Sequence, residues 1–153
     1  MSLSMKSPAF ADGDPIPKKH SCQGEDVSPA LTWDGIPAEA KSIALIVDDP
    51  DAPGGTWVHW LAYNIPPSTQ GLPEAVPGRK VGEDGMKQGR NDFGRISYGG
   101  PCPPPGKAHR YFFKIYALDA ILDLEAGASR AQLEAAMKSR ILAEGRLVGT
   151  FRR

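Results

Sequence analysis

Glycine and proline divide this chain into short segments. They occur 17 and 15 times among 153 residues, and few stretches between them are long. Proline lacks the amide donor that regular structure needs, and glycine weakens helices and strands. The aromatic-rich segments that remain have the length and composition of strands bounded by turns. We therefore expect a single domain over residues 5–153, mainly β, with many ordered loops.

Three segments have the strongest strand patterns: residues 42–47, 57–65 and 109–118. The first is continuously apolar, which predicts burial on both faces. In the second, strict alternation would place one set of side chains together on one face: Trp57, His59, Leu61, Tyr63 and Ile65. In the third, alternation places His109 on the face of Tyr111. Shorter strands are expected near residues 31–33 and 147–151.

One helix is predicted, over residues 129–144. Ser129 followed by Gln132 has the pattern of a capping box. Apolar residues then recur every four positions, at Leu133, Met137 and Ile141. Gly145 is the expected C-terminal stop. Several strands and one helix, without a regular alternation of the two, predict a mainly antiparallel β fold.

Charge and hydropathy exclude several classes of protein. The 18 basic residues balance 18 acidic ones, so the basic excess of a nucleic-acid-binding protein is missing. No segment approaches the roughly 20 apolar residues that cross a bilayer, and no signal-peptide pattern is present. We expect a cytoplasmic protein without membrane insertion or cofactor. Residues 1–4 resemble a vector-derived leader, so the domain is expected to begin at residue 5.

The two cysteines, Cys22 and Cys102, lie far apart in the sequence and neither has a CxxC partner. This excludes zinc-ribbon and thioredoxin patterns. In a cytosolic protein we expect both to stay reduced and to pack as small buried hydrophobic residues. The alternative is a reactive thiol close to His109.

The candidate functional residues surround a long irregular stretch, residues 66–105, which we expect to form functional loops with at most one short strand or turn inside. His59 and His109 each begin an aromatic strand, and an acidic run that includes Asp49 and Asp51 follows the buried one. Taken singly, these residues also fit satisfied core histidines and ordinary turn formers. Together with the loops they favour a site.

Four ordered motifs in this sequence resemble the phosphatidylethanolamine-binding protein family, in particular its bacterial and archaeal Raf-kinase-inhibitor-like branch. They are the sequences of residues 49–53 (DPDAP), 57–60 (WVHW), 99–104 (GGPCPP) and 109–111 (HRY). The upstream run of residues 16–33 also resembles that branch, so the similarity covers nearly all of residues 8–151.

The resemblance implies a β-sandwich of two antiparallel sheets with a shallow anion pocket at one end. It implies that the pocket residues are Asp49, Asp51, His59, His109 and Tyr111, with a wall formed by Trp57, Gly100, Pro101 and Pro103. The C-terminal helix of the animal members has no counterpart after Phe151. The resemblance also implies a homodimer, as in bacterial relatives.

A phosphate group needs hydrogen-bond donors, which the histidine N–H groups, the Tyr111 hydroxyl and loop amides would supply. Asp49 would fix a histidine tautomer or meet the amine of an ethanolamine-like headgroup. We expect a non-enzymatic protein that binds a phosphate-bearing small molecule. Two alternatives stay open: an inhibitor of a kinase or serine protease, suggested by family analogy alone, and a weak hydrolase or metal-dependent enzyme that uses Asp49, His59 and His109. The spacing matches no known metal motif, so we expect no metal.

Overall fold

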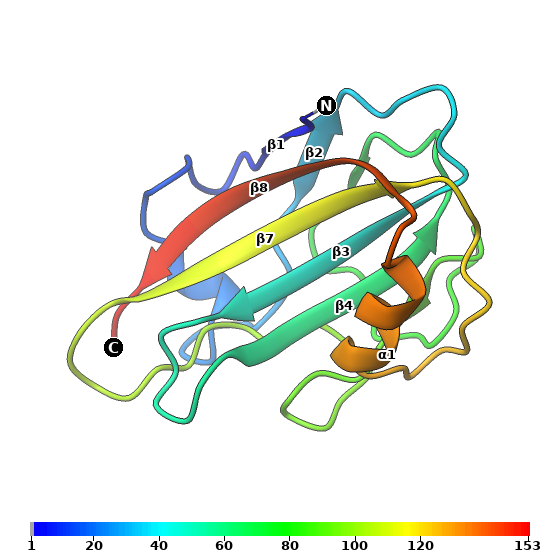
Figure 1. The fold of residues 1–153 in the computed structure, drawn as a ribbon. Helices are drawn as coiled ribbons and strands as arrows, with labels where there is room; N and C mark the ends of the chain where they lie inside the picture. Colours follow the sequence, from blue (N-terminus) through cyan, green and yellow to red (C-terminus); the bar gives the residue numbers. More distant parts are fainter. Residues whose placement is uncertain (1) are drawn as a thin grey trace.

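A computed structural model describes residues 2–153. Eight strands form two sheets, in the orders β1–β2–β5 and β6–β4–β3–β7–β8 (Figure 1). Neighbouring strands within each sheet are antiparallel. The strands are β1 (Ser4–Lys6), β2 (Leu31–Asp34), β3 (Ser42–Asp49), β4 (Trp57–Ile65), β5 (Gly71–Leu72), β6 (Lys87–Gln88), β7 (His109–Leu118) and β8 (Ile141–Phe151). One α-helix, α1 (Arg130–Met137), precedes β8, and a 3₁₀ turn, η1, spans Lys18–His20. The predicted mainly antiparallel β fold with one helix near the C-terminus is confirmed.

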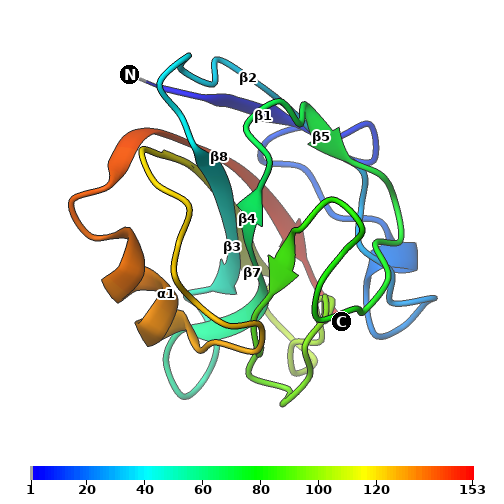
Figure 2. The ribbon, with the colours of Figure 1, turned by 90° about the vertical axis from the view of Figure 1, so that its right-hand side faces the viewer.

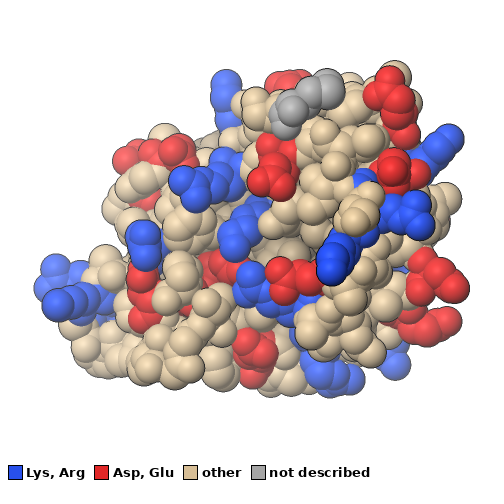
Figure 3. Space-filling model, viewed as in Figure 1, with Lys and Arg blue, Asp and Glu red and all other residues tan. Residues whose placement is uncertain are grey.

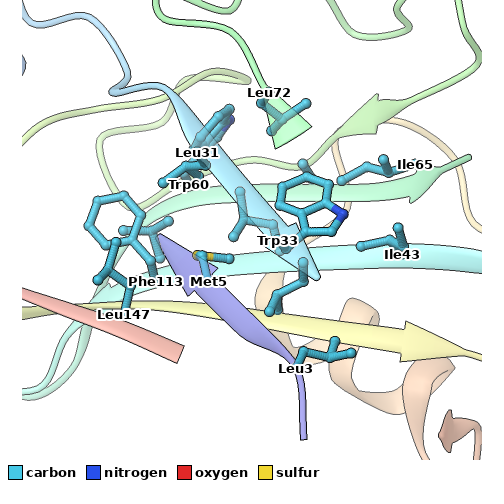
Figure 4. Packing of buried hydrophobic residues seen from close by; sticks show 14 of the residues in the cluster. Leu3, Met5, Leu31, Trp33, Ile43, Trp60, Ile65, Leu72, Phe113 and Leu147 are labelled. Carbon is cyan, nitrogen blue, oxygen red and sulfur yellow. The ribbon is translucent and has the colours of Figure 1, made fainter. Parts of the chain in front are cut away.

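The five-stranded sheet lies between the smaller sheet and α1 (Figure 2). Every residue of β3 is buried, because its side chains pack alternately into one layer and the other. The layer between the two sheets holds most of the large apolar side chains (Figure 4). The layer beneath α1 is smaller and includes Leu133 and Met137 from the helix. Burial of β3 on both faces, predicted from its continuous apolar run, is therefore confirmed.

Two β-bulges interrupt the alternation of β4, and the predicted arrangement of its faces is wrong. Pairing of Val47 with Trp60 and of Asp48 with Val58 leaves His59 as an extra residue. A second register shift occurs close to Asn64, whose φ is 53°. As a result, Trp60, Ala62 and Ile65 pack between the sheets, and Val58, Leu61 and Tyr63 pack towards α1.

The predicted helix is too long. The capping box at Ser129 and Gln132 is present, but α1 ends at Met137. Ser139 has a φ of 65°, a left-handed conformation that turns the chain away from the helix axis. Residues 141–151 then pair with β7 along its whole length. Gly145 is therefore a strand residue, and a Cβ atom there would lie 2.2 Å from the carbonyl oxygen of Leu3.

Residues 2–4, which precede the expected start of the domain at residue 5, take part in the fold. Leu3 is 6% exposed and packs in the core between the sheets. Its amide donates to the carbonyl of Glu144 at 2.9 Å. Ser4 begins β1, which pairs with β2. The sequence near the N-terminus does not indicate the burial of Leu3, because Leu3 is held by strand β8, near the other end of the chain.

Cys22 and Cys102 form a disulfide, with their Cα atoms 5.4 Å apart. The expectation of two reduced, buried thiols is wrong, because both residues are exposed and the fold brings them together. The segment after η1 lies along the loop that precedes β7: the Cys22 amide donates to the Pro101 carbonyl at 3.1 Å, and the Tyr98 hydroxyl donates to the His20 carbonyl at 2.7 Å.

Candidate functional site

A hollow of about 200 Å³ opens where β3 ends and where β4 and β7 begin. Because adjacent strands are antiparallel, the C-terminal end of β3 lies beside the N-terminal ends of both neighbours. This brings residues from three distant parts of the sequence to one end of the sheet. The lining residues are Asp49, Ala52, Pro53, Trp57, His59, Phe93, Cys102, Pro103, Pro104, His109 and Tyr111.

Asp49 fixes His109 at the edge of this hollow. The Asp49 Oδ2 atom lies 2.7 Å from His109 Nδ1, and its Oδ1 atom accepts from the Asp51 amide at 2.7 Å. The carboxylate is 3% exposed, whereas the imidazole is partly open to solvent. Since a carboxylate accepts, Nδ1 carries the proton and Nε2 is the ring nitrogen left for a ligand.

His59 is held in a similar way, by a neutral acceptor. Its Nδ1 donates to the Gly99 carbonyl at 2.7 Å, and its ring packs edge-on against Tyr111 with centroids 5.1 Å apart. Burial lowers the pKa of His59, so the ring is neutral near pH 7 and its Nε2 is a hydrogen-bond acceptor. The expectation that both histidines supply N–H donors therefore does not hold for neutral His59.

Tyr111 supplies the donor that the fold leaves unused. Its hydroxyl is buried and has no hydrogen-bond partner within residues 2–153. Burial, the charge of Asp49 and the closeness of its carboxylate to the hydroxyl raise the pKa of Tyr111, so the hydroxyl keeps its proton. Asp49 is the nearby acceptor, but no hydrogen bond of ordinary geometry links the two groups. A buried hydroxyl without a partner is unfavourable, and most such groups in proteins are satisfied by protein, water or ligand.

The wall of the hollow is largely apolar. Trp57 and Phe93 are each 39% exposed, and their rings meet edge to face with centroids 5.5 Å apart. Phe93 is held in place because Asp92 exchanges two hydrogen bonds with the backbone of Val58. Pro103 and Pro104 lie in the same lining.

Six of the nine residues expected in the pocket line this hollow: Asp49, Trp57, His59, Pro103, His109 and Tyr111. Three do not. Asp51 accepts two bonds from the Arg110 guanidinium and one from its amide, and these hold the pKa of Asp51 at about 2. Gly100 donates to Asp26 at 2.8 Å, and Pro101 accepts from Cys22. These three residues brace the loops around the hollow.

Sequence reasoning missed Ala52, Pro53, Phe93 and Pro104 as lining residues. Phe93 is a single aromatic residue in an irregular, charged stretch, and its sequence position does not show that the loop folds back onto β4. The other three lie within the quoted motifs, so adjacency to expected pocket residues was the signal that could have found them. Within residues 2–153, no three His, Cys, Asp or Glu side chains are grouped so that they could hold a metal ion.

The family model described as "Phosphatidylethanolamine-binding protein" matches residues 6–152. The chain belongs to this family. The resemblance found in the sequence is confirmed, and members of the phosphatidylethanolamine-binding protein family are generally binding proteins without catalytic activity. None of the helices described over residues 2–153 has the length and apolar character of a membrane span.

Relatives of this chain match it along nearly its whole length. A UPF0098 protein of Methanothermobacter thermautotrophicus is 52% identical over 151 residues, which cover 99% of both chains. A UPF0098 protein of Aquifex aeolicus is 50% identical over 99% of this chain and 89% of the relative.

Two solved structures share the fold. A phosphatidylethanolamine-binding protein homologue of Chlamydia trachomatis superimposes with a TM-score of 0.91 at 43% identity, covering 99% of this chain and 98% of the other. YbcL of E. coli, described as a member of the mammalian family, gives a TM-score of 0.91 at 35% identity and covers 100% and 99%.

Proposed function

We propose that this protein binds a phosphate-bearing small molecule in the hollow between Asp49 and His109 and that it does so without catalysis. The observation that carries the proposal is the unpartnered Tyr111 hydroxyl, which is a buried donor next to two imidazoles of fixed tautomer. A phosphate oxygen is a strong acceptor for such a donor. The hollow, at about 200 Å³, fits a phosphate group with a small substituent.

The arrangement of donors and acceptors favours a phosphate that carries one proton. Neutral His59 offers an acceptor at Nε2, which a P–OH group satisfies and a fully ionised phosphate does not. His109 likewise has only its Nε2 atom left for a ligand, because Asp49 holds its Nδ1 proton. Phosphate monoesters lose their second proton near pH 6, so binding should strengthen as the pH falls from 8 towards 6.

The apolar wall argues that the phosphate carries an organic substituent with apolar surface of its own. Trp57, Phe93 and the two prolines would lie beside this substituent, and its binding would remove part of their apolar surface from contact with water. This is consistent with an organic phosphate rather than with inorganic phosphate alone. Whether that group is a lipid headgroup or a soluble metabolite is decided by the experiment below.

The test is a titration with inorganic phosphate, phosphoethanolamine and a nucleoside monophosphate at pH 6 and pH 8, followed by calorimetry and ³¹P NMR. His109→Ala and Tyr111→Phe should each weaken binding about tenfold or more, as expected for lost hydrogen bonds to a charged group. Lys41→Ala, an exposed residue at the other end of β3, is the matched control. Equal affinity in the wild type and both pocket variants would overturn the proposal. Release of inorganic phosphate from the esters would favour the hydrolase alternative.

Cytoplasmic location and homodimer formation stay predictions. The Cys22–Cys102 disulfide bears on the first, because disulfides persist in oxidising compartments and in the intracellular proteins of hyperthermophiles. A cytoplasmic location is therefore consistent with this bond only if the protein comes from a hyperthermophile. Sedimentation of the purified protein tests the dimer.

A further inference from the structure

A second hollow, of about 310 Å³, lies on the opposite face of the five-stranded sheet, on the side of α1. Successive side chains of a strand point to opposite faces of the sheet. Asp49 and His109 therefore line the first hollow, whereas their sequence neighbours Asp48 and Arg110 line the second. Figure 3 shows this face, where Lys and Arg side chains gather over the middle of the sheet with acidic ones beside them.

Basic side chains outnumber acidic ones in this second hollow. Its lining includes Arg110, Lys114, Arg130 and Arg146. The only carboxylate in the lining is that of Asp48, which is 1% exposed. One oxygen of Asp48 serves two cations, Lys114 Nζ at 3.1 Å and Arg130 Nη1 at 2.8 Å. Arg110 is held by Asp51. In the described part of the chain, Arg146 has no carboxylate within 4.0 Å, so positive charge is in excess.

The strand register places two of these cations directly against each other. Lys114 of β7 is the cross-strand partner of Arg146 of β8. Like charges at opposite positions of an antiparallel pair destabilise the sheet. Asp48 offsets only the Lys114 side of this pair, so an anion beside Arg146 would remove an unfavourable interaction that the folded chain retains.

Phe112 holds the cations around one point. The cationic groups of Arg110, Lys114 and Arg146 lie 5.5, 5.8 and 5.3 Å from the centre of its ring. Such contacts are weak at exposed positions, about 0.5–1 kcal/mol. They restrict where the long side chains lie without neutralising them. Arg110 donates to Asp51 and Lys114 to Asp48, whereas the Arg146 guanidinium has no carboxylate partner in the described part of the chain.

We propose that this hollow is an anion site for a phosphate group, with Arg146 and Lys114 as its main ligands. Guanidinium groups match phosphate oxygens in geometry and charge. The site suits a small anion and not a long polyanion, because Glu134 pairs with Arg130 at one side and Glu144 lines the adjoining surface next to Arg146. The zero net charge of the whole chain points the same way. This proposal does not depend on the function assigned to the first hollow.

The test uses inorganic phosphate and pyrophosphate as probes of ¹⁵N-labelled protein. Saturating shifts of the Arg146 and Arg130 side-chain Nε–H signals are expected. Arg146→Gln removes the Arg146 signal, and it should weaken the binding followed at the Arg130 Nε–H signal about tenfold or more. The same titration in Arg146→Gln should leave any shifts of the His59 and His109 ring signals unchanged, which separates this site from the first.

Lys41→Gln, which removes an exposed cation at the far end of β3, is the charge-matched control and should bind the probes as the wild type does. Because Arg146 is exposed and lacks a carboxylate partner, Arg146→Gln should fold normally, as the amide spectrum will show. Equal weakening by the two variants, or shifts that rise linearly without saturation, would mean nonspecific charge screening and would overturn the proposal.

Discussion

Asp49 Oδ2 accepts a hydrogen bond from His109 Nδ1 at 2.7 Å, although the two residues lie 60 positions apart in the sequence. The antiparallel pairing of β3 with β7 places the end of one strand beside the start of the other and so makes this contact. The carboxylate sets the tautomer of the imidazole and fixes the ring, as carboxylates do for histidines in many functional sites.

Replacement of Asp49 tests whether this contact organises the site. Asp49→Ala removes two hydrogen bonds, to His109 and to the Asp51 amide, and should lower the free energy of unfolding by about 1–3 kcal/mol. Urea denaturation measures this loss. Asp49→Asn retains one acceptor oxygen and should fall between the wild type and Asp49→Ala. A stability for Asp49→Ala equal to that of the wild type would show that neither bond contributes.

Tyr111→Phe separates stability from binding. The hydroxyl has no partner within residues 2–153, and a buried unpaired polar group costs about 1–3 kcal/mol. The variant should therefore be as stable as the wild type or about 1 kcal/mol more stable, while it binds phosphate esters about tenfold more weakly. Thermal denaturation and calorimetry give the two quantities. A marked loss of stability would mean that the hydroxyl already has a partner in solution and is not held in reserve for a ligand.

His59 should make the stability depend on pH. Burial lowers its pKa in the folded state, so the unfolded chain binds more protons once the pH falls below the ordinary histidine value of about 6.5. The contribution of neutral His59 is present above that pH and is lost as the pH falls towards the folded-state pKa. Urea denaturation at pH 7.5 and pH 5.5 should show lower stability at pH 5.5.

His59→Asn is the comparison for this pH effect, because asparagine does not titrate and its amide is able to donate to the Gly99 carbonyl. The decrease in stability between pH 7.5 and pH 5.5 should be smaller in this variant. If both proteins lose the same amount, His59 is not the group responsible.

The disulfide should make a large contribution to stability. It joins residues separated by 80 positions, and closing a loop of this length in the unfolded chain corresponds to about 4 kcal/mol. The double variant Cys22→Ser, Cys102→Ser should lose up to that amount in urea denaturation. Alkylation followed by intact-mass measurement, with and without reductant, shows whether the bond is present. Full alkylation without reductant would contradict it.

The strands of the five-stranded sheet could be predicted with good accuracy because their signal is local. The bounds of β4 and β7 agree with the sequence prediction, and β3 extends only two residues further. The capping box at Ser129 is likewise a pattern within four residues. Burial and hydrogen bonding within such short segments depend mostly on side chains that are neighbours in the sequence.

The errors lie where distant segments decide the outcome. The bulge at His59 depends on register with β3, and β8 begins at Ile141 because β7 offers a partner that a helix of the same residues lacks. The Cys22–Cys102 bond and the burial of Leu3 depend on contacts between segments that are far apart in the sequence. For the site, the family resemblance supplied the expected residues. The structure alone shows that Asp49 lines the hollow, whereas Asp51 binds Arg110 outside it.

The bond between Cys22 and Cys102 turns the stretch from residue 22 to residue 102 into a covalent ring that contains β2, β3, β4 and the long loop before β7. A protease that cuts once inside this ring, for example at the exposed Arg79 or Lys80 between β5 and β6, would open the ring without releasing a fragment. The nicked molecule would keep its full mass until a reductant separated the two pieces. Cleavage in the cell could therefore pass unnoticed on a nonreducing gel.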